Sequence, residues 1–447
     1  MNTIADVDIV GGWLPVVVGG LALAALVLAL ARRTSLRRGL VLLGSALAGA
    51  GVGLALCWIL SDRLDLFEVS LSPVSRGWVA VAFAAVGLAI AAATRRGAGR
   101  RAAAIAAIPL ALLVGTIGVN ADFGQYTTIG SLWDASAARP LPASVLAAQE
   151  AEAPGATASG AGVPDAAVPA LWKREDGGGM PSHGIVGRVE IPATVSHFAA
   201  RAGYVYLPPA ALVAHPVRLP VLIMLSGQPG GPDDVVQAGR LAQIMDARAA
   251  ADHGLAPIVV VPDQLSAPAV NPMCVDSPGL GNSATYLTVD VPNWIRTHLA
   301  VQASPGAWAI GGFSQGGTCA IQLGAAHPEL FSAIFDVSGQ VAPKNGNLSH
   351  TIAVGFGGDA ARYRAALPEA LLAAHAPYRG EVAVFGSGQF DAKYGPGVDQ
   401  MAAAARAAGI AVTRVVAPGT AHDWHTVQWV MSHAFGPIAT HLGLEHG

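Results

Sequence analysis

The sequence predicts a protein of two parts: an all-α membrane domain of four helices, followed by an α/β domain with a mostly parallel sheet flanked by helices. Two observations lead to this prediction. Four nearly uncharged apolar runs occur before residue 120. After residue 184, short β-branched runs alternate with helical stretches, as is typical of a parallel sheet. With 12% charged residues among 447 and a mean hydropathy of +0.48, the chain is too apolar for an ordinary soluble protein.

The four apolar runs have, or approach, the length that a helix needs to cross a hydrocarbon core about 30 Å thick. They are residues 13–31, 39–60, 78–94 and 102–119, within a domain that spans 1–135. Alanine and glycine are abundant in them, and small residues favour close helix packing in lipid. A buried helical domain is the alternative. A cleaved signal peptide fits poorly, because the basic cluster follows the first run.

Arginine positions predict the orientation of these helices. Two clusters separate the first run from the second and the third from the fourth: Arg32, Arg33, Arg37 and Arg38, then Arg95, Arg96, Arg100 and Arg101. Positive charge is enriched in cytoplasmic loops. We therefore expect a multi-pass cell-membrane protein with both termini and the α/β domain outside the cytoplasm. Abundant Ala, Gly and Arg with few Lys indicate a GC-rich bacterial source.

A compositional change separates the two parts. Residues 136–183 are rich in Ala, Pro, Gly and small polar residues and show no sustained period. This composition predicts a flexible linker, although residues 142–152 have the composition for a helical turn or two. The α/β domain then spans 184–447.

The α/β domain contains a Gly-x-Ser-x-Gly motif in a specific local context. An apolar run over 307–310 leads into it, and a helical stretch over 318–323 follows. The motif is Gly312-Phe313-Ser314-Gln315-Gly316. A strand, a tight turn and a helix are what a nucleophile elbow requires, and the helix N-terminus favours the negative charge that develops there. The motif predicts an α/β-hydrolase fold with Ser314 as nucleophile.

A serine hydroxyl needs a base, which in this fold follows the last strand. Residues 412–416 read as that strand, and His422 lies in the loop after it. His422 is therefore the predicted base. His425 is the nearby alternative, and two ordinary surface histidines are the non-catalytic interpretation.

The acid of such a triad lies between the nucleophile and the base in the chain. Residues 381–386 read as a strand, and Asp391 follows in a glycine-rich loop, so Asp391 is the predicted acid. Asp399 on the same segment is the alternative. Asp423 ranks last, because a carboxylate adjacent to His422 in the chain reaches the far ring nitrogen with difficulty.

An oxyanion hole is the third requirement. The apolar strand 221–225 is followed by the glycine-rich loop 226–231. In this fold such a loop supplies one backbone amide, and the residue after the nucleophile supplies the other. The predicted donors are the amides of Gln228 and Gln315. A plain turn is the alternative interpretation of the loop.

Several motifs occur together in a fixed order. They are Leu207-Pro208-Pro209, the loop 225–231, the motif 312–317, residues 327–331, Val337-Ser338-Gly339 and residues 419–424. As a set they resemble the Putative esterase family of α/β-hydrolases, which includes esterase D and the antigen 85 mycolyltransferases. The resemblance covers about residue 185 to the C-terminus. It implies a Ser-Asp/Glu-His triad, no metal, and ester hydrolysis or acyl transfer.

Cysteine usage fits an oxidising compartment. Of three cysteines, Cys57 lies in the second apolar run, whereas Cys274 and Cys319 fall near the catalytic end of the sheet. We predict a disulfide between Cys274 and Cys319 that pins the Cys274 loop over the site. Two free thiols are the alternative.

Two long segments, 268–286 and 340–380, are placed to shape an acyl pocket. Asp276 and Asp359 are the candidate substrate-binding residues in them, with turn or helix capping as the alternative role. The net charge of −3 gives no case for nucleic acid. No P-loop, dinucleotide fingerprint, CxxC pair or HExxH motif occurs, so we expect no cofactor and no metal.

The predicted function is a membrane-anchored serine esterase acting through an acyl-enzyme on Ser314, with a lipid or cell-envelope acyl ester as substrate. Acyl transfer to a sugar or lipid hydroxyl is the first alternative. A non-catalytic, membrane-anchored binding module is the second. A transporter is disfavoured, because the apolar runs contain almost no ionisable residue. The sequence leaves the natural substrate and the oligomeric state open.

Overall fold

The computed structural model describes residues 4–31, 35–94, 97–133, 139–155 and 179–444. The chain forms two compact units. The first unit comprises Met1–Ala137 with two short segments from the C-terminal half, Phe390–Lys393 and Gly419–His425. The second unit comprises Ala138–Gln389, Tyr394–Pro418 and Thr426–Gly447.

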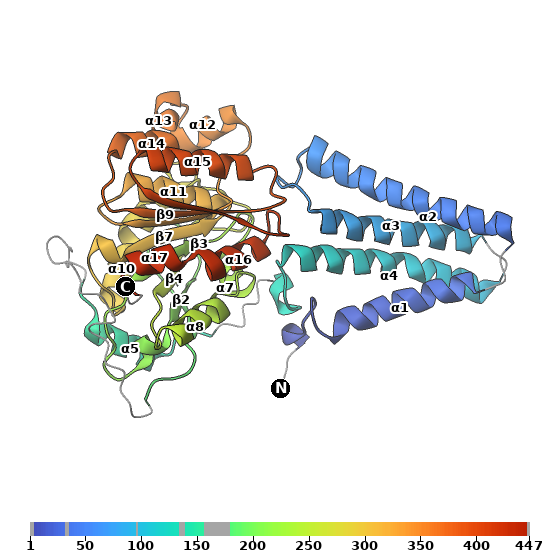
Figure 1. Ribbon diagram of the computed structural model, residues 1–447, viewed down its shortest axis with the longest axis horizontal. Coiled ribbons are helices and arrows are strands. Elements are labelled where there is room, and N and C mark those ends of the chain that lie inside the picture. The colour runs from blue at the N-terminus through green and yellow to red at the C-terminus, as the bar shows by residue number, and fades with distance from the viewer. Residues whose placement is uncertain (1–3, 32–34, 95–96, 134–138, 156–178, 445–447) are drawn as a thin grey trace. The chain divides into compact units, whose positions relative to one another are not determined.

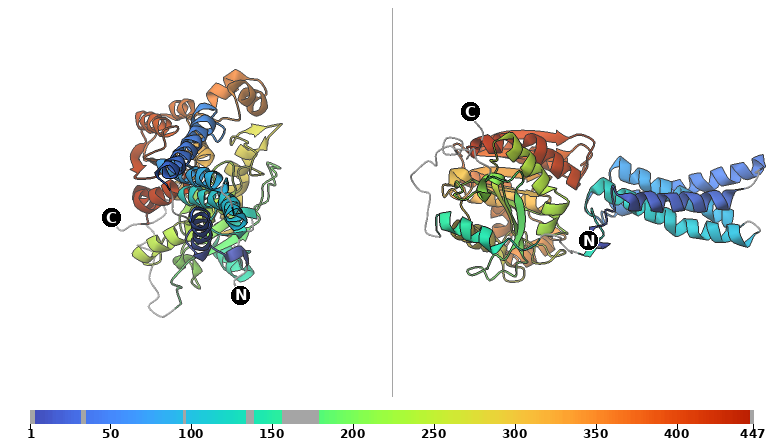
Figure 2. Two further views of the ribbon diagram at one scale, coloured as in Figure 1. Left: turned by 90° about the vertical axis from the view of Figure 1, so that its right-hand side faces the viewer. Right: turned by 90° about the horizontal axis from the view of Figure 1, so that it is seen from below.

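Four helices, each long and apolar enough to cross a membrane, form most of the first unit (Figure 1). They are α1 (Trp13–Leu30), α2 (Leu36–Cys57), α3 (Pro73–Ala93) and α4 (Ala98–Phe123), and α2 continues as a π-helical segment over Trp58–Arg63. Figure 2 shows this bundle from two further directions. Helices α2 and α3 pack together, as do α3 and α4, and α1 packs on α4.

Glycine permits the close approach of α2 and α3. A Cβ atom on Gly49 would lie 2.2 Å from the Phe83 carbonyl oxygen, and one on Gly87 would lie 2.1 Å from the Ser45 carbonyl oxygen. Both positions therefore require glycine, which is the small-residue packing that the sequence suggests.

The helices extend beyond the predicted apolar runs. Helix α3 begins at Pro73, five residues before its run, because the Ser72 hydroxyl accepts a hydrogen bond from the Ser75 amide at 2.9 Å and proline suits the first helical position. Arg37, Arg38, Arg100 and Arg101 lie in the first turns of α2 and α4. Arg32, Arg33, Arg95 and Arg96 lie outside the described residues.

The predicted linker contains a packed helix. Helix α5 (Ala143–Glu152) carries Gln149, whose side chain is fully buried. Its Nε2 donates to the Ala211 carbonyl at 2.7 Å, and its Oε1 accepts from the Ala300 amide at 3.2 Å. This part of the expected tether is therefore folded onto the second unit, through long-range contacts that composition does not reveal. Residues 156–178 of the linker lie outside the described residues.

An eight-stranded sheet forms the centre of the second unit. Its order is β1 (Ile185–Val189), β2 (Gly203–Leu207), β4 (Ile258–Val261), β3 (Val221–Leu225), β7 (Trp308–Phe313), β8 (Ala333–Val337), β9 (Val382–Gly388) and β10 (Ala411–Ala417). The pairs β1–β2 and β2–β4 are antiparallel, and all others are parallel. The predicted mostly parallel sheet flanked by helices is confirmed.

Helices cover both faces of the sheet (Figure 1). On one face, Ile334 and Phe385 join a core with α11 (Gln315–Ala326), α14 (Pro368–His375) and α15 (Gly395–Ala407). On the other face, Phe335 stacks edge-on against Phe435, between α16 (Trp424–Ala434) and α17 (Gly436–His441), and Arg248 of α8 (Leu241–Ala251) lies over the same ring. Neighbouring residues of a strand, such as Ile334 and Phe335, therefore pack against helices on opposite faces of the sheet.

Shorter elements complete the second unit. They are α7 (Pro232–Gln237), the two-stranded β5 (Asp276–Ser277) and β6 (Gly281–Asn282), α9 (Ser283–Thr285), α10 (Val291–His298), α12 (Leu348–Phe356) and α13 (Ala360–Ala365). The parallel strands β3, β4, β7, β8, β9 and β10 all end at one edge of the sheet. In open α/β sheets this edge is where ligands bind.

Candidate active site

The turn between β7 and α11 holds Ser314 in a strained conformation. Ser314 has φ 56° and ψ −114°, a region that L-residues with a Cβ atom rarely adopt. Its amide donates to the Val337 carbonyl at 2.8 Å, which ties the turn to the neighbouring strand β8. The Ser314 residue is buried, with 7% of its surface exposed. The helix N-terminus at Gln315 begins directly behind it.

Glycines at 312 and 316 make this turn possible. A Cβ atom on Gly312 would lie 2.2 Å from the Gly316 carbonyl carbon. A Cβ atom on Gly316 would lie 2.5 Å from the carbonyl oxygens of Leu225 and Ser226. Neither position tolerates a side chain, so the sequence motif has a steric explanation in the close crossing of the elbow and the loop after β3.

The predicted acid and base are hydrogen-bonded to each other. His422 Nδ1 lies 2.9 Å from Asp391 Oδ2, and both side chains are buried. Because a carboxylate only accepts, Nδ1 carries the proton in this pair. Asp391 follows β9 and His422 follows β10, which are adjacent parallel strands. Ser314 belongs to the other unit, and its pairing with His422 is part of the proposal below.

The alternatives for acid and base have other partners. Asp399 is exposed and forms an ion pair with Arg414 at 2.7 Å. The Asp423 carboxylate accepts from the Ala421 amide at 2.7 Å and so shapes the turn before the base. The His425 ring binds a backbone carbonyl of α4, at 2.9 Å from Ala121 O. Of the three carboxylates considered, Asp391 is the one seen to bind His422.

The loop after β3 lies directly against the nucleophile. A Cβ atom on Gly227 would be 3.7 Å from Ser314 Cβ and 3.2 Å from the Phe313 ring. Gln228 follows, and its side-chain amide donates to the Ala269 carbonyl at 3.2 Å. The Gln315 backbone amide, the second predicted donor, belongs to the first residue of α11. The predicted donors thus belong to the loop after β3 and to the first residue of α11, the two segments next to Ser314, and their oxyanion role stays a prediction.

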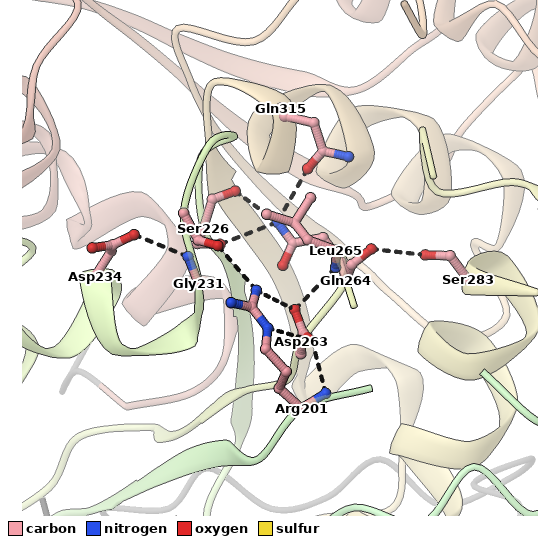
Figure 3. Close-up of polar contacts among 10 residues, drawn as sticks. Arg201, Ser226, Gly231, Asp234, Asp263, Gln264, Leu265, Ser283 and Gln315 are labelled. Atoms are coloured by element: carbon pink, nitrogen blue, oxygen red, sulfur yellow. Dashed lines mark hydrogen bonds and ion pairs between the residues drawn. The ribbon is translucent and has the colours of Figure 1, made fainter. Parts of the chain in front are cut away.

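A polar network supports this loop from below (Figure 3). Arg201 forms an ion pair with the buried Asp263 at 2.9 Å and donates to the Gly230 carbonyl at 3.0 Å. Gln264 Nε2 donates to the Ser226 carbonyl at 2.7 Å and to Gln315 Oε1 at 3.1 Å. One buried amide therefore joins the β3 loop to the first residue of α11.

Sequence reasoning missed Arg201, Asp263 and Gln264. A signal was present for the last two, because a polar pair that follows the apolar strand β4 after a single proline stands at the ligand-binding edge of the sheet. Arg201 precedes β2 and offers no comparable signal. Its role depends on an ion pair across 62 positions of the chain.

We expect Gln264→Met to lower kcat for an ester by roughly tenfold, below the about 10²–10³ that a lost oxyanion donor costs. Methionine keeps the length of the side chain but removes the donor to the Ser226 carbonyl and to the Gln315 side-chain oxygen Oε1. We expect KM to change little. Steady-state kinetics measure the effect. Gln428→Met is the matched control, because Gln428 also donates to a backbone carbonyl, at 2.7 Å from Ala238 O. Equal losses in both variants would contradict the assignment.

Cys274 and Cys319 form a disulfide between the loop after β4 and helix α11. Gln315 Nε2 lies 3.2 Å from Cys319 Sγ and 3.1 Å from Asn271 Oδ1. The bridge thus pins the 268–286 loop beside the first turn of α11. Disulfides that close loops of this size contribute about 2–4 kcal/mol to stability. Cys57 is a buried free cysteine.

The two candidate substrate-binding carboxylates both make local hydrogen bonds. Asp276 accepts from the amide and the hydroxyl of Thr285, at 3.0 and 2.6 Å. Asp359 is the N-cap of α13 and accepts from the amides of Arg362 and Ala361, which hold the pKa of its carboxyl below the usual range. These contacts match the capping role that was the alternative, and a role in substrate binding stays a prediction.

A further buried carboxyl lies behind the elbow. Asp336 of β8 is fully buried, and its Oδ1 accepts from the Gly339 amide at 2.9 Å. A Cβ atom on Gly317 would lie 2.4 Å from the same oxygen. Burial raises the pKa of Asp336 to about 7. Its position indicates that it packs the turn after β8 against the start of α11.

Comparisons with known proteins identify a family and a relative that match part of this chain. The sequence pattern of the Putative esterase family matches residues 199–422. An uncharacterized protein of Corynebacterium glutamicum is 34% identical over 258 residues, which are 56% of this chain and 60% of that protein. The chain therefore matches less than two thirds of the length of this relative.

Three solved structures are similar to part of this chain. An S-formylglutathione hydrolase from Agrobacterium tumefaciens has 20% identity and a TM-score of 0.48, and the match covers 59% of this chain and 96% of the hydrolase chain. A ferulic acid esterase has 19% identity and a TM-score of 0.49, covering 58% and 98%. MPT51 of Mycobacterium tuberculosis has 18% identity and a TM-score of 0.44, covering 57% and 98%.

Proposed function

This chain belongs to the Putative esterase family, and we propose that it is a membrane-anchored serine esterase that cleaves lipid or cell-envelope acyl esters through an acyl-enzyme on Ser314. The observation that carries the proposal is the strained Ser314 backbone at the end of β7, with φ 56° in a residue that has a Cβ atom. Such strain persists only where the surrounding structure maintains it, and it clusters at active sites.

In the proposed mechanism, Ser314 Oγ attacks the ester carbonyl carbon while His422 Nε2 takes the hydroxyl proton. The tetrahedral intermediate then collapses, and the alcohol leaves with that proton. Water repeats the sequence on the acyl-enzyme and releases the carboxylic acid. The 2.9 Å hydrogen bond between Asp391 and His422 Nδ1 supports these roles, because it fixes the tautomer in which Nε2 accepts.

The negative charge on the carbonyl oxygen requires donors that are in place before the reaction. We assign these to the backbone amides of Gln228 and Gln315, on the two segments that flank Ser314. The N-terminus of α11 adds a favourable field at the same point. Gln264 supports the arrangement by binding both segments.

The proposed lipid or cell-envelope substrate is supported by the expected location of the protein in the membrane. Helices α1 to α4 have the length and hydropathy of membrane spans. Arg37, Arg38, Arg100 and Arg101 lie at the starts of α2 and α4. These two starts share one end of the bundle, because α2 and α3 are antiparallel and the end of α3 packs against the start of α4. By the positive-inside rule, we expect that end to lie in the cytoplasm and the esterase domain to lie outside it. An active site tethered there meets lipid and envelope esters before soluble ones.

The experiment uses the full-length protein in lipid nanodiscs. A fluorophosphonate probe reports a reactive serine, and p-nitrophenyl esters of two to sixteen carbons report the acyl preference. We expect labelling and turnover, with higher kcat/KM for the longer chains. A well-folded protein that neither reacts with the probe nor cleaves any ester would overturn the proposal and favour the binding module.

The same assay separates hydrolysis from transfer. Added sugar or glycerol hydroxyls compete with water for the acyl-enzyme. An acylated acceptor detected by mass spectrometry, formed faster than free acid, would identify an acyltransferase that uses the same Ser314 chemistry. Free acid as the main product at all acceptor concentrations supports the esterase.

A further inference from the structure

The loops that carry Asp391 and His422 cluster with the membrane helices in the first unit. Residues Phe390–Lys393 and Gly419–His425 belong to this unit although they follow β9 and β10. The contacts that hold them there come from residues two or three positions after the predicted acid and base. The ends of α2 and α4 therefore contact the loops that carry the predicted acid and base.

The base loop binds the C-terminal end of α4. Trp424 Nε1 donates to Gln125 Oε1 at 2.7 Å, and Trp424 is 3% exposed. His425 Nε2 donates to the Ala121 carbonyl at 2.9 Å. Ala121 lies in the last turn of α4, where helix carbonyls lack a partner within the helix, so His425 satisfies an otherwise open acceptor.

Glycine at 124 leaves room for this contact. Gly124 ends α4 in the left-handed conformation with φ 66°. A Cβ atom there would lie 3.2 Å from His425 Nε2. The position thus favours glycine for its backbone conformation and for the approach of the histidine ring.

The acid loop binds the segment after α2. Lys393 Nζ, two residues beyond Asp391, lies 2.6 Å from Asp65 Oδ2. Asp65 follows the π-helical end of α2 and has φ 51°. This pair is partly exposed, with side chains 24% and 48% accessible, so it adds little to stability. It joins the loop after β9 to the segment after α2.

The receiving end of the helix bundle is itself braced. Asp122 Oδ2 accepts from the hydroxyls of Ser72 and Ser75 at the start of α3. The Asn120 side chain binds both the amide and the carbonyl of Tyr126, at 3.0 and 2.7 Å. The Asn120 contacts close the short turn that contains Gln125, and the Asp122 contacts join the end of α4 to the start of α3.

We propose that Gln125, the Ala121 carbonyl and Asp65 form a positioning platform that holds the Asp391–His422 pair in its working geometry. The membrane helices then set the catalytic efficiency of the enzyme as well as anchoring it. This inference rests on the proposed function, because it assigns these residues through the acid and base of the triad. None of them touches the reacting atoms in this scheme.

The test compares variants of the full-length protein in nanodiscs. Trp424→Phe keeps an aromatic ring but removes the donor, and Gln125→Leu removes the acceptor. We expect each to lower kcat by about tenfold or more with KM within about twofold, since a misplacement of roughly 1 Å costs about 10²-fold. Fluorophosphonate labelling should slow by a similar factor. Gln125→Glu keeps an oxygen acceptor and should retain kcat.

A double variant and two controls make the test specific. Because one hydrogen bond joins Trp424 and Gln125, the double variant Trp424→Phe/Gln125→Leu should be no slower than either single variant. Trp429→Phe is the matched aromatic control further along α16, where Trp429 stacks on His433. Asp65→Asn is compared with Asp62→Asn, which breaks the Asp62–Arg76 pair in the same segment and should leave kcat unchanged.

The outcomes separate this inference from the proposed function. If the unmodified protein turns over no ester, the proposed function fails and the platform with it. If the protein is active and Trp424→Phe, Gln125→Leu and Asp65→Asn all keep kcat within twofold, the platform is refuted while the esterase stands. Additive losses in the double variant, or an equal loss in Gln125→Glu, would likewise refute it.

Discussion

Replacing Ser314 with alanine is expected to lower ester turnover by about 10⁴-fold or more, because the acyl-enzyme can no longer form. Alanine keeps the Cβ atom and therefore the strained turn, so the change removes the nucleophile without relaxing the elbow. Binding of a non-hydrolysable ester analogue should be retained. The measurements are kcat for a p-nitrophenyl ester and covalent labelling by a fluorophosphonate, and both should disappear together.

Ser432→Ala is the control for this experiment. Ser432 is an exposed serine on α16, remote in the chain from the elbow. Its variant should be labelled and should turn over ester as the unmodified protein does. If Ser314→Ala were still labelled at the normal rate, another serine would be the nucleophile and the assignment of the elbow would be wrong.

The elbow could be predicted because its determinants are local. The strained Ser314, the glycines at 312 and 316 and the flanking strand and helix lie within one short stretch of chain. The mostly parallel sheet could be predicted from the alternation of apolar and helical runs in the same way. Periodicity and glycine placement carry this information without any knowledge of distant contacts.

The supporting residues could not be predicted because their roles depend on contacts distant in sequence. Arg201 pairs with Asp263 across 62 positions, and Trp424 binds Gln125 across 299. The packing of helix α5 could not be predicted for the same reason, since Gln149 finds its partners at Ala211 and Ala300. An Ala-rich segment shows no apolar period that would reveal such a contact.

Replacing Asp391 with asparagine is expected to lower kcat by about 10⁴-fold with little change in KM. Asparagine has the size of aspartate, but its amide can turn an N–H group toward His422 Nδ1. The ring then carries its proton on Nε2, where the proposed mechanism needs a lone pair. The buried 2.9 Å contact between Asp391 and His422 is the reason to expect so large an effect from a nearly isosteric change.

Asp399→Asn is the matched control, because Asp399 lies on the same segment and was the alternative acid. Its carboxylate is exposed and paired with Arg414, and removing one charge from such a pair costs little. Its kcat should stay within about twofold of the unmodified protein. A large loss in Asp399→Asn with normal turnover in Asp391→Asn would move the acid to Asp399. In that case the hydrogen bond from His422 to Asp391 would be structural, and the platform proposed for the acid loop would lose its catalytic meaning.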